Sequence, residues 1–516
     1  MKFSTLRIIL AAGIVMGAFP ACNTEGGQVH LKGKLLNMPG RTATMSYDGA
    51  SSILGNSRDI TLHLDAEGCF DTVISLNKPA YYNISRNTVY LTPGDELTMK
   101  ITQRNKDAEF LGKGAEANNY LKERLFPHAG SFLGGGVNMK NSFESTRRMI
   151  DSMALARRTQ LTSLENVSEE FKRLENARIS ADVLNSYNYY PIYANIHAKN
   201  KNIPELAIRR HQVDSFYLAI SEDMKSLAEE LNDESVLDVA VARSVLDNLL
   251  SNRQMQSWAE GIAFVPEVQE LVMAAQWADK LNEYLDAESI SLATAYANNM
   301  KDREMAQELL SKIQQSSRLL NGPVIDFSLT DVEGNSCRLS DFKGKVLYID
   351  LWATWCGPCV KESPYFESLA KEYEGKDIVF LTISTDNSKK TWKKYLESNP
   401  KKLPQYHSTD PALKEGWAIK YIPRFILINK DFNIADAYAP RPSEDSIREK
   451  LEYLLKCKHP IKYTIPNITK AAIPIVGYAA FAIYSHSFSH LCGSSCSSSS
   501  FVAFCIYGIL AITSLR

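Results

Sequence analysis

The feature that most constrains the fold of this 516-residue chain is a cysteine pair set between an apolar run and a helical pattern. Residues 346–351 are apolar apart from Asp350, as expected of a buried parallel strand. Residues 352–359 read Trp-Ala-Thr-Trp-Cys-Gly-Pro-Cys, and a helical pattern follows to about Tyr373. Backbone N–H groups and the helix dipole stabilise an anion at a helix start. We therefore predict that Cys356 has a lowered pKa and reacts as a thiolate.

The segments around this pair follow a recognisable order. Strands are expected at 378–384, 425–428 and 434–438, helices at 389–398 and 443–456, and a short hairpin around 331–335. This β-α-β-α-β-β-α order, with Cys-x-x-Cys at a strand-to-helix junction, predicts an α/β domain with the thioredoxin fold. A zinc site is the alternative use of a cysteine pair, but the second pair of ligands is not evident. We predict neither a metal nor a cofactor.

Residues 322–456 resemble the TlpA/ResA-type branch of extracytoplasmic thioredoxins. The resemblance is carried by the motif at 352–359, by Lys-Gly-Lys-Val at 343–346, and by Ile422-Pro423. It implies a thiol–disulfide oxidoreductase in which Cys356 attacks a substrate disulfide. Cys359 would then resolve the mixed disulfide and release reduced substrate.

The same resemblance implies roles for two acids. Asp350 matches the buried aspartate that helps to deprotonate the resolving cysteine in thioredoxins. Glu362 lies three residues after Cys359 and matches the acidic residue of the ResA-like branch. Burial would raise the pKa of such a carboxyl toward neutrality, which suits a general base. The alternative for Glu362 is an ordinary glutamate on the helix surface.

The substrate-binding surface is expected to include Trp355, Gly357, Pro358, Ile422 and Pro423. In the family the proline matching Pro423 is cis and lies against the cysteines. Trp352 and Trp355 are expected to pack around the redox pair, and Trp355 is favoured as the contact. Arg424 departs from the usual threonine, and at the rim of the site its charge would favour an acidic substrate.

The start of the chain reads as an export signal. Lys2 and Arg7 precede an apolar stretch at 8–19, and Ala21-Cys22 resembles a bacterial lipobox. Residues 1–21 are therefore predicted to be a signal peptide and Cys22 the lipidated residue. An ordinary secretory signal is the alternative. Both place the protein outside the cytoplasm, and the first anchors it to a membrane, facing the periplasm.

The remaining chain divides into three predicted regions. Residues 28–103 read as a small antiparallel β domain, with a hairpin at Thr92-Pro93-Gly94-Asp95, and resemble the domain that precedes thioredoxin-like domains in Bacteroidetes lipoproteins. Residues 114–320 have helical periodicity and predict six or seven helices. Residues 457–516 form an apolar, Ser-rich tail without acids, either membrane-associated or a shifted reading frame. The whole is a multidomain α+β protein.

Composition limits the partners. The chain has 58 basic and 59 acidic side chains, so no basic excess points to nucleic acid. Lysines at 389, 390, 393, 394, 401 and 402 are expected to solvate an exposed helix and loop. The expected partners are a disulfide-containing exported protein, with apocytochrome c as one candidate, and a membrane thiol–disulfide electron donor. The helical region is a candidate surface for homodimerisation.

Two other functions stay open at this level. A thiol peroxidase would need Pro-x-x-x-Thr-x-x-Cys, whereas Thr354 stands two residues before Cys356 and no matching proline precedes it. A binding lipoprotein with an ancillary redox domain is the second alternative, because more than half of the chain lies outside residues 322–456.

Overall fold

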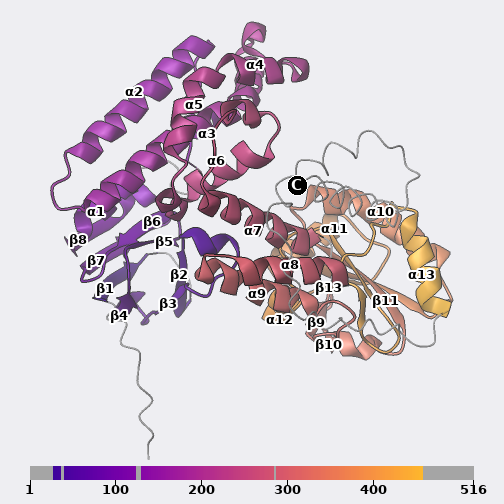
Figure 1. Cartoon of the computed structure of the whole chain (residues 1–516). Coiled ribbons are helices and arrows are strands. Elements are labelled where there is room, and N and C mark those ends of the chain that lie inside the picture. Colours follow the sequence, from indigo (N-terminus) through magenta and orange to yellow (C-terminus); the bar gives the residue numbers. More distant parts are fainter. Residues whose placement is uncertain (1–26, 37–39, 124–129, 284–285, 457–516) are drawn as a thin grey trace, which may run out of the picture. The chain divides into compact units, whose positions relative to one another are not determined.

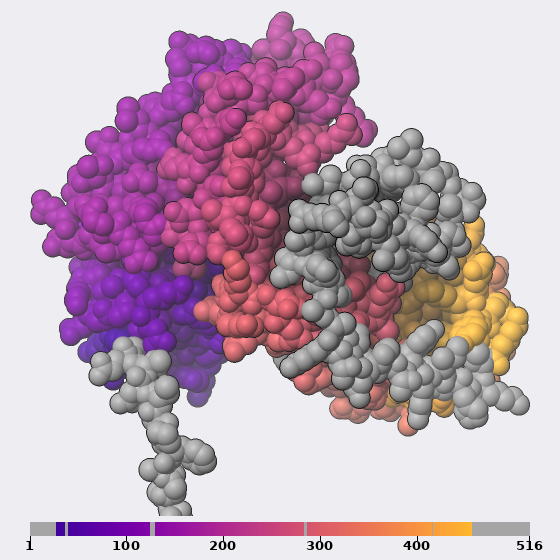
Figure 2. Space-filling model, viewed as in Figure 1, coloured from indigo at the N-terminus to yellow at the C-terminus, as the bar shows by residue number. Residues whose placement is uncertain are grey.

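The computed structural model describes residues 27–36, 40–123, 130–283 and 286–456 (Figure 1). The other residues are grey in Figure 1 and in the space-filling view of Figure 2. The predicted signal peptide, Cys22 and the tail at 457–516 lie outside the described residues.

Two four-stranded sheets form the N-terminal region. The first has the order β4-β1-β7-β8, with β1 (Gly27–Leu35), β4 (Cys69–Leu76), β7 (Glu96–Ile101) and β8 (Glu109–Lys113). The second has the order β3-β2-β5-β6, with β2 (Thr42–Tyr47), β3 (Ile60–His63), β5 (Ala80–Ile84) and β6 (Asn87–Leu91). β1 and β7 are parallel, so the expectation of a purely antiparallel domain is wrong for this pair. Strand β8 also lies beyond the predicted end at residue 103.

The turn at residues 92–95 forms, but it does not make a hairpin. Gly94 has φ of 88°, and the Asp95 carboxylate accepts a hydrogen bond from the Thr92 N–H at 2.7 Å. The strands on either side belong to different sheets, because β6 pairs with β5 whereas β7 pairs with β1 and β8. The turn therefore passes the chain from one sheet to the other.

The helical region contains more helices than predicted. Its described residues include α1 (Ala115–Lys122), α2 (Phe143–Thr162), α3 (Glu169–Lys201), α4 (Val213–Ala219), α5 (Ser221–Glu230), α6 (Ala240–Ser251), α7 (Pro266–Glu283), α8 (Ala287–Asn299) and α9 (Arg303–Ser317). Part of the difference arises at Ile220, where φ and ψ of −109° and 6° interrupt the pattern and separate α4 from α5. Apolar spacing alone did not predict this break.

The second sheet and the helices share one apolar core. Tyr90 of β6 lies 4.9 Å from Phe171 of α3, measured between ring centres. The Tyr81 hydroxyl donates to Glu175 at 2.8 Å, and Glu175 pairs with Arg178 at 2.7 Å, both charges being fully buried. A buried pair of this kind is costly to break, because each partner would leave an uncompensated charge.

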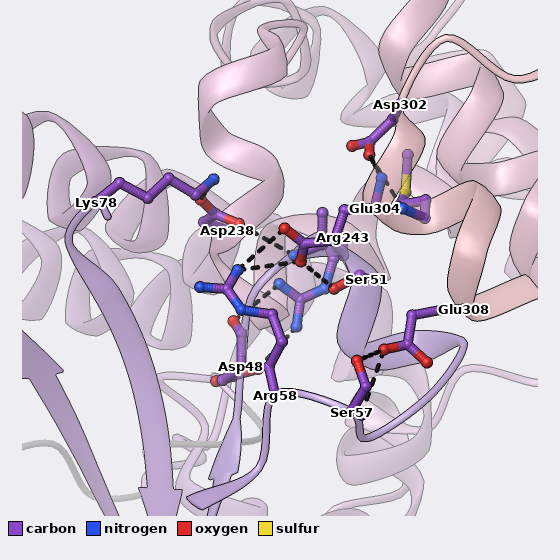
Figure 3. Close-up of polar contacts among 12 residues, drawn as sticks. Asp48, Ser51, Ser57, Arg58, Lys78, Asp238, Arg243, Asp302, Glu304 and Glu308 are labelled. Atoms are coloured by element: carbon purple, nitrogen blue, oxygen red, sulfur yellow. Dashed lines mark hydrogen bonds and ion pairs between the residues drawn. The ribbon is translucent and has the colours of Figure 1, made fainter. Parts of the chain in front are cut away.

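Polar contacts join the β2–β3 connection to the helices (Figure 3). Arg243 of α6 pairs with Asp48 at 2.7 Å, and both are buried. On α9, Glu304 accepts hydrogen bonds from Ser51 and Arg58, and Glu308 accepts from Ser57. The β strands and the helices are therefore linked by ion pairs as well as by apolar packing.

The C-terminal region is built around a seven-stranded sheet of order β10-β9-β13-β12-β11-β14-β15. Its strands are β9 (Ser328–Asp331), β10 (Ser336–Arg338), β11 (Val346–Trp352), β12 (Ile378–Ser384), β13 (Gln405–His407), β14 (Arg424–Ile428) and β15 (Ile434–Asp436). Its helices are α10 (Gly357–Glu372), α11 (Lys389–Ser398), α12 (Pro411–Gly416) and α13 (Ser446–Lys456). The predicted β9–β10 hairpin is present, whereas β13 and α12 were missed.

Strand β11 lies inside this sheet, between β12 and β14, and leads directly to the cysteine pair. All its residues are buried, and it pairs in parallel with β12 and antiparallel with β14. Alternate residues of a strand face opposite sides. Tyr348 packs with residues of α10 and α13 on one side, whereas Ile349 packs with residues near α12 on the other. Asp350 and Trp352 therefore share the α10 side with Tyr348.

Candidate redox site

The two cysteines lie at the start of α10. Cys356 is the N-cap residue, and its sulfur accepts a hydrogen bond from the Cys359 N–H at 3.3 Å. The two are joined by a disulfide, with Cα atoms 5.3 Å apart. Gly357 and Pro358 fill the first turn, where proline is tolerated because no intrahelical N–H bond is required. In the reduced protein, the helix N-terminus would stabilise a thiolate at Cys356.

Apolar side chains enclose the sulfur atoms. Cys356 and Cys359 are only 4% and 1% exposed, and they cluster with Trp352, Ala353, Trp392 and Leu396. Gly357 and Pro358 are exposed beside them. Trp355 is 73% exposed and lies outside this cluster. Trp352 ends the buried strand and packs in the cluster with both cysteines, whereas Trp355 presents its ring to solvent.

The segment before β14 completes the surface next to the cysteines. The Ile422–Pro423 peptide bond is cis, as expected. Ile422 is half-buried and packs against the cluster that contains both cysteines. Pro423 is also partly exposed. The structure therefore places Ile422 against the redox pair, and Pro423 follows it through the cis peptide bond.

Asp350 of β11 is a buried acid beside the redox pair in sequence. It is 3% exposed, and its Oδ1 has no hydrogen-bond partner among the described residues. Burial raises the pKa of this carboxyl to about 7, with the positive charge of Lys401 acting against the rise and the negative charge of Glu362 adding to it. A carboxyl with such a pKa exchanges its proton near neutral pH, as the predicted general base requires.

Glu362 lies on the inner side of α10 rather than on the helix surface, since its side chain is buried. Its Oε1 accepts a hydrogen bond from the Ser443 hydroxyl at 3.0 Å, and Arg441 approaches the same oxygen to 4.0 Å. The carboxylate is therefore held by the segment that precedes α13. The simple surface alternative for this residue does not fit the structure.

Comparison with known proteins shows which family the C-terminal region resembles. The Redoxin family model matches residues 320–455. The thiol-disulfide oxidoreductase ResA of Bacillus thuringiensis is 28% identical over 127 residues, which is 25% of this chain and 73% of that protein. ResA of Bacillus subtilis is 26% identical over 129 residues, 25% of this chain and 72% of that protein.

Solved structures match the same part of the chain. A thiol-disulfide oxidoreductase from Bacteroides vulgatus is 63% identical, with 27% of this chain and 99% of that chain covered and a TM-score of 0.27. The exposed lipoprotein thioredoxin of Streptococcus pneumoniae is 30% identical, with 25% and 99% covered and a TM-score of 0.24.

The C-terminal region is a TlpA/ResA-like domain of the thioredoxin family. The chain is accordingly a thiol–disulfide redox enzyme, with helices and two further sheets preceding its TlpA/ResA-like domain.

Two residues of the TlpA/ResA-like domain have a place at the site that the sequence did not indicate. Asp386 follows β12 and accepts hydrogen bonds from Thr354, in the loop before Cys356. Lys401 donates to Ser363 at 2.7 Å and lies near the ring of Trp352. A buried acid just after a parallel strand was the available signal for Asp386. Lys401 had no distinguishing signal, because it is one of several lysines in this part of the sequence.

Arg424 is not at the rim of the TlpA/ResA-like site, so that expectation is wrong. Its side chain is buried and lies over the ring of Tyr438, with the guanidinium carbon 3.2 Å from the ring centre. The guanidinium donates to the backbone carbonyls of Ala437 and Asn282. The charge therefore binds carbonyl groups and the end of α7, and it is not available to a substrate.

The described residues outside the redox pair include two further cysteines. Cys69 and Cys337 are free thiols there. No group of three or more metal-binding side chains occurs in the described part of the chain. Among the described helices, none combines the length and apolar character needed to cross a membrane.

Proposed function

We propose that this chain is an extracytoplasmic, lipid-anchored oxidoreductase that reduces disulfides of exported proteins through Cys356 and Cys359. The observation that carries the proposal is the position of Cys356 at the N-cap of α10, with Cys359 buried one turn later. A thiolate at the helix start attacks, and a sheltered thiol nearby resolves the product.

The reaction proceeds in two exchanges. The Cys356 thiolate attacks one sulfur of the substrate disulfide, forming a mixed disulfide and releasing the other substrate sulfur as a thiolate. Cys359 then loses its proton and attacks the Cys356 sulfur. This step forms the Cys356–Cys359 disulfide and releases the second substrate thiolate. The substrate gains two electrons, and the enzyme loses them.

Asp350 takes the proton that Cys359 must lose. Its carboxyl lies on the α10 side of β11, and its pKa of about 7 allows it to accept a proton at neutral pH. Burial also leaves its Oδ1 unpartnered among the described residues. Glu362, held by Ser443, acts on this proton transfer through its negative charge, which favours the protonated form of Asp350.

Thiol–disulfide exchange requires both a disulfide substrate and an electron donor, and we propose a class of molecule for each. Trp355, Gly357 and Pro358 are exposed beside the buried sulfurs and form the surface on which a polypeptide is bound, with Ile422 and Pro423 as its other edge. A membrane thiol–disulfide donor would return the pair to the dithiol form. Lipidation at Cys22 would keep the enzyme at that membrane.

The reduction potential of the pair tests this proposal. The full chain is equilibrated with glutathione or dithiothreitol buffers, and the thiol fraction is measured. A value near or below about −250 mV supports a reductant, whereas one near about −120 mV would make the protein an oxidant. The Cys337→Ser variant is the matched control, because it removes a free thiol that is not part of the pair.

Trapping separates the two cysteine roles. Cys359→Ser is expected to accumulate a mixed disulfide with substrate, because the resolving thiol is missing. Cys356→Ser is expected to accumulate none. A chain that consumed peroxide instead, with Cys356 oxidised to sulfenic acid, would favour the peroxidase alternative. The Thr354 hydroxyl donates to Asp386, so it does not supply the peroxidase-type contact to Cys356.

A further inference from the structure

Helix α11 carries an unusual set of charges. Lys389, Lys390, Lys393 and Lys394 lie at its start, and its first turn has no acid. Cations are disfavoured at a helix N-terminus, and like charges four residues apart repel one another. Lys389 and Lys393, and likewise Lys390 and Lys394, have that spacing. Among the described residues, no ion pair with an acid relieves these four side chains.

These lysines lie beside the redox loop. Asp386, three residues before α11, accepts hydrogen bonds from both the N–H and the hydroxyl of Thr354. Another face of α11 is part of the redox site itself, because Trp392 and Leu396 pack in the cluster with both cysteines. The first two turns of α11 therefore form one wall of the site, with Lys390 and Lys394 exposed on its solvent side and Lys389 and Lys393 half-buried.

Neighbouring groups extend the same surface. Lys414 is exposed, and its Nζ lies 3.5 Å from Oδ1 of Asn387, the residue before the α11 cap. Trp355 is 73% exposed, on the loop that Asp386 holds. Residues 389–402 contain six lysines and one acid, in a chain whose net charge is −1. We call Lys389, Lys390, Lys393, Lys394 and Lys414 the lysine face.

We propose that the lysine face receives an acidic segment flanking the disulfide of the polypeptide substrate. This rests on the proposed function. A substrate that presents its disulfide to Cys356 must lay adjacent chain over Trp355 and the start of α11. Carboxylates there would meet both the lysines and the positive end of the helix. Complementary charge steers encounter and fixes register, which suits an enzyme that selects among exported proteins.

Matched peptides test this preference. Two peptides share one intramolecular disulfide and differ only in flanking residues, Asp and Glu in one and Lys and Arg in the other. The reduced full chain is mixed with each, and the second-order rate of peptide reduction is measured. We expect the acidic peptide to react about tenfold faster at low salt. This advantage should shrink toward 1 M salt, where the Debye length falls to about 3 Å.

A charge-reversal variant assigns the preference to the lysine face. In Lys389→Glu/Lys390→Glu/Lys394→Glu, the acidic peptide should react more slowly and the basic peptide faster. A folding defect would slow both, so opposite changes identify electrostatics. The matched control is Lys343→Glu/Lys345→Glu. These two exposed lysines precede the first residue of β11, whereas the cysteines follow its last residue. This control should keep the wild-type ratio of the two rates.

The outcomes separate this inference from the proposed function. Equal, salt-independent rates for the two peptides, or an unchanged ratio in the triple variant, overturn the lysine-face proposal while the reductase function stands. If the chain reduces none of the acidic, basic and neutral peptides, both the lysine-face proposal and the proposed reductase function are overturned. If vesicles with phosphatidylglycerol bind wild type and not the triple variant, and the peptide ratio does not change, the face contacts lipid and the proposal is wrong.

Discussion

The carboxylate of Asp386 accepts two hydrogen bonds from Thr354, one from its N–H at 3.0 Å and one from its hydroxyl at 2.8 Å. Ser384 donates to the same carboxylate at 2.8 Å. These contacts tie the end of β12 to the loop that carries Cys356. The position of the redox loop thus depends on a strand that contributes no residue to the chemistry.

Removing the Thr354 hydroxyl should weaken this tie. Thr354→Val preserves shape but leaves the buried carboxylate of Asp386 with one partner fewer. Hydrogen bonds to charged groups contribute about 1.5–3 kcal/mol, so the free energy of unfolding in urea should fall by about that amount. Thr391→Val, which removes an exposed hydroxyl from α11, should change it by less than about 0.5 kcal/mol. Equal effects for the two variants would contradict the assignment.

Asp350 should make stability depend on pH. Burial raises its pKa from 3.8 to about 7, so between these values the unfolded chain holds fewer protons than the folded one. Stability from this group is therefore complete below pH 4 and is lost as pH rises through 7. Asp350→Asn removes the dependence. Relative to wild type, its unfolding free energy should rise by about 1.4 kcal/mol per pH unit across the window.

Urea unfolding at several pH values measures this difference. Glu397→Gln, an exposed acid on α11, is the control and should follow wild type. A constant offset between Asp350→Asn and wild type from pH 4 to 7 would show that the carboxyl is not held protonated. Above pH 7 the Asn variant should resolve mixed disulfides more slowly although it is the more stable protein.

Reversing one charge at the start of α11 should stabilise the helix. In Lys389→Glu an acid replaces a base in the first turn, and the repulsion between Lys389 and Lys393 becomes attraction. The expected gain in unfolding free energy is about 0.3–1 kcal/mol at low ionic strength, and it should disappear in 1 M salt. A loss of stability at low salt would argue that Lys389 already has a partner.

Arg424 should contribute to stability through the carbonyls that it binds. Arg424→Ala leaves the carbonyls of Ala437 and Asn282 without this donor and removes the guanidinium from the Tyr438 ring. We expect the unfolding free energy to fall by about 2–4 kcal/mol. Hydrogen exchange near the end of α7 should accelerate. Arg448→Ala, whose ion pairs are exposed, should cost less than about 1 kcal/mol.

Local sequence signals indicated where the cysteine pair and the acids near it lie in the fold. The apolar run that becomes β11, the cysteine pair at the start of α10 and the acids on each side are all encoded within a few residues of one another. Each depends on neighbouring backbone geometry, either helix capping or strand alternation. The strand β13 was missed because it has only three residues and its partners, β9 and β12, lie elsewhere in the sequence.

Long-range packing decided the features that the sequence did not predict. The turn at Pro93-Gly94 forms as its residues require, yet only the pairing of β7 with β1 determines which sheet receives the chain. Strand alternation could have predicted the burial of Arg424. Adjacent residues of a strand face opposite sides, so if Pro423 faces the redox site, Arg424 faces away from it. Its partner Asn282 is 142 residues away, so no local pattern indicated where the charge would be satisfied.

The shared core of the second sheet and the helices bears on how such a protein can be rearranged in evolution. Tyr81 and Glu175 lie on either side of the predicted boundary between the β and helical regions, yet they bond to each other in that core. The apolar clusters of the redox domain draw only on residues from Leu319 onward, within the described chain. Recombination near residue 320 would leave these cores intact, whereas exchange of the strands alone would disrupt one. The strands and helices are therefore expected to be inherited together, as a single unit joined to a thioredoxin.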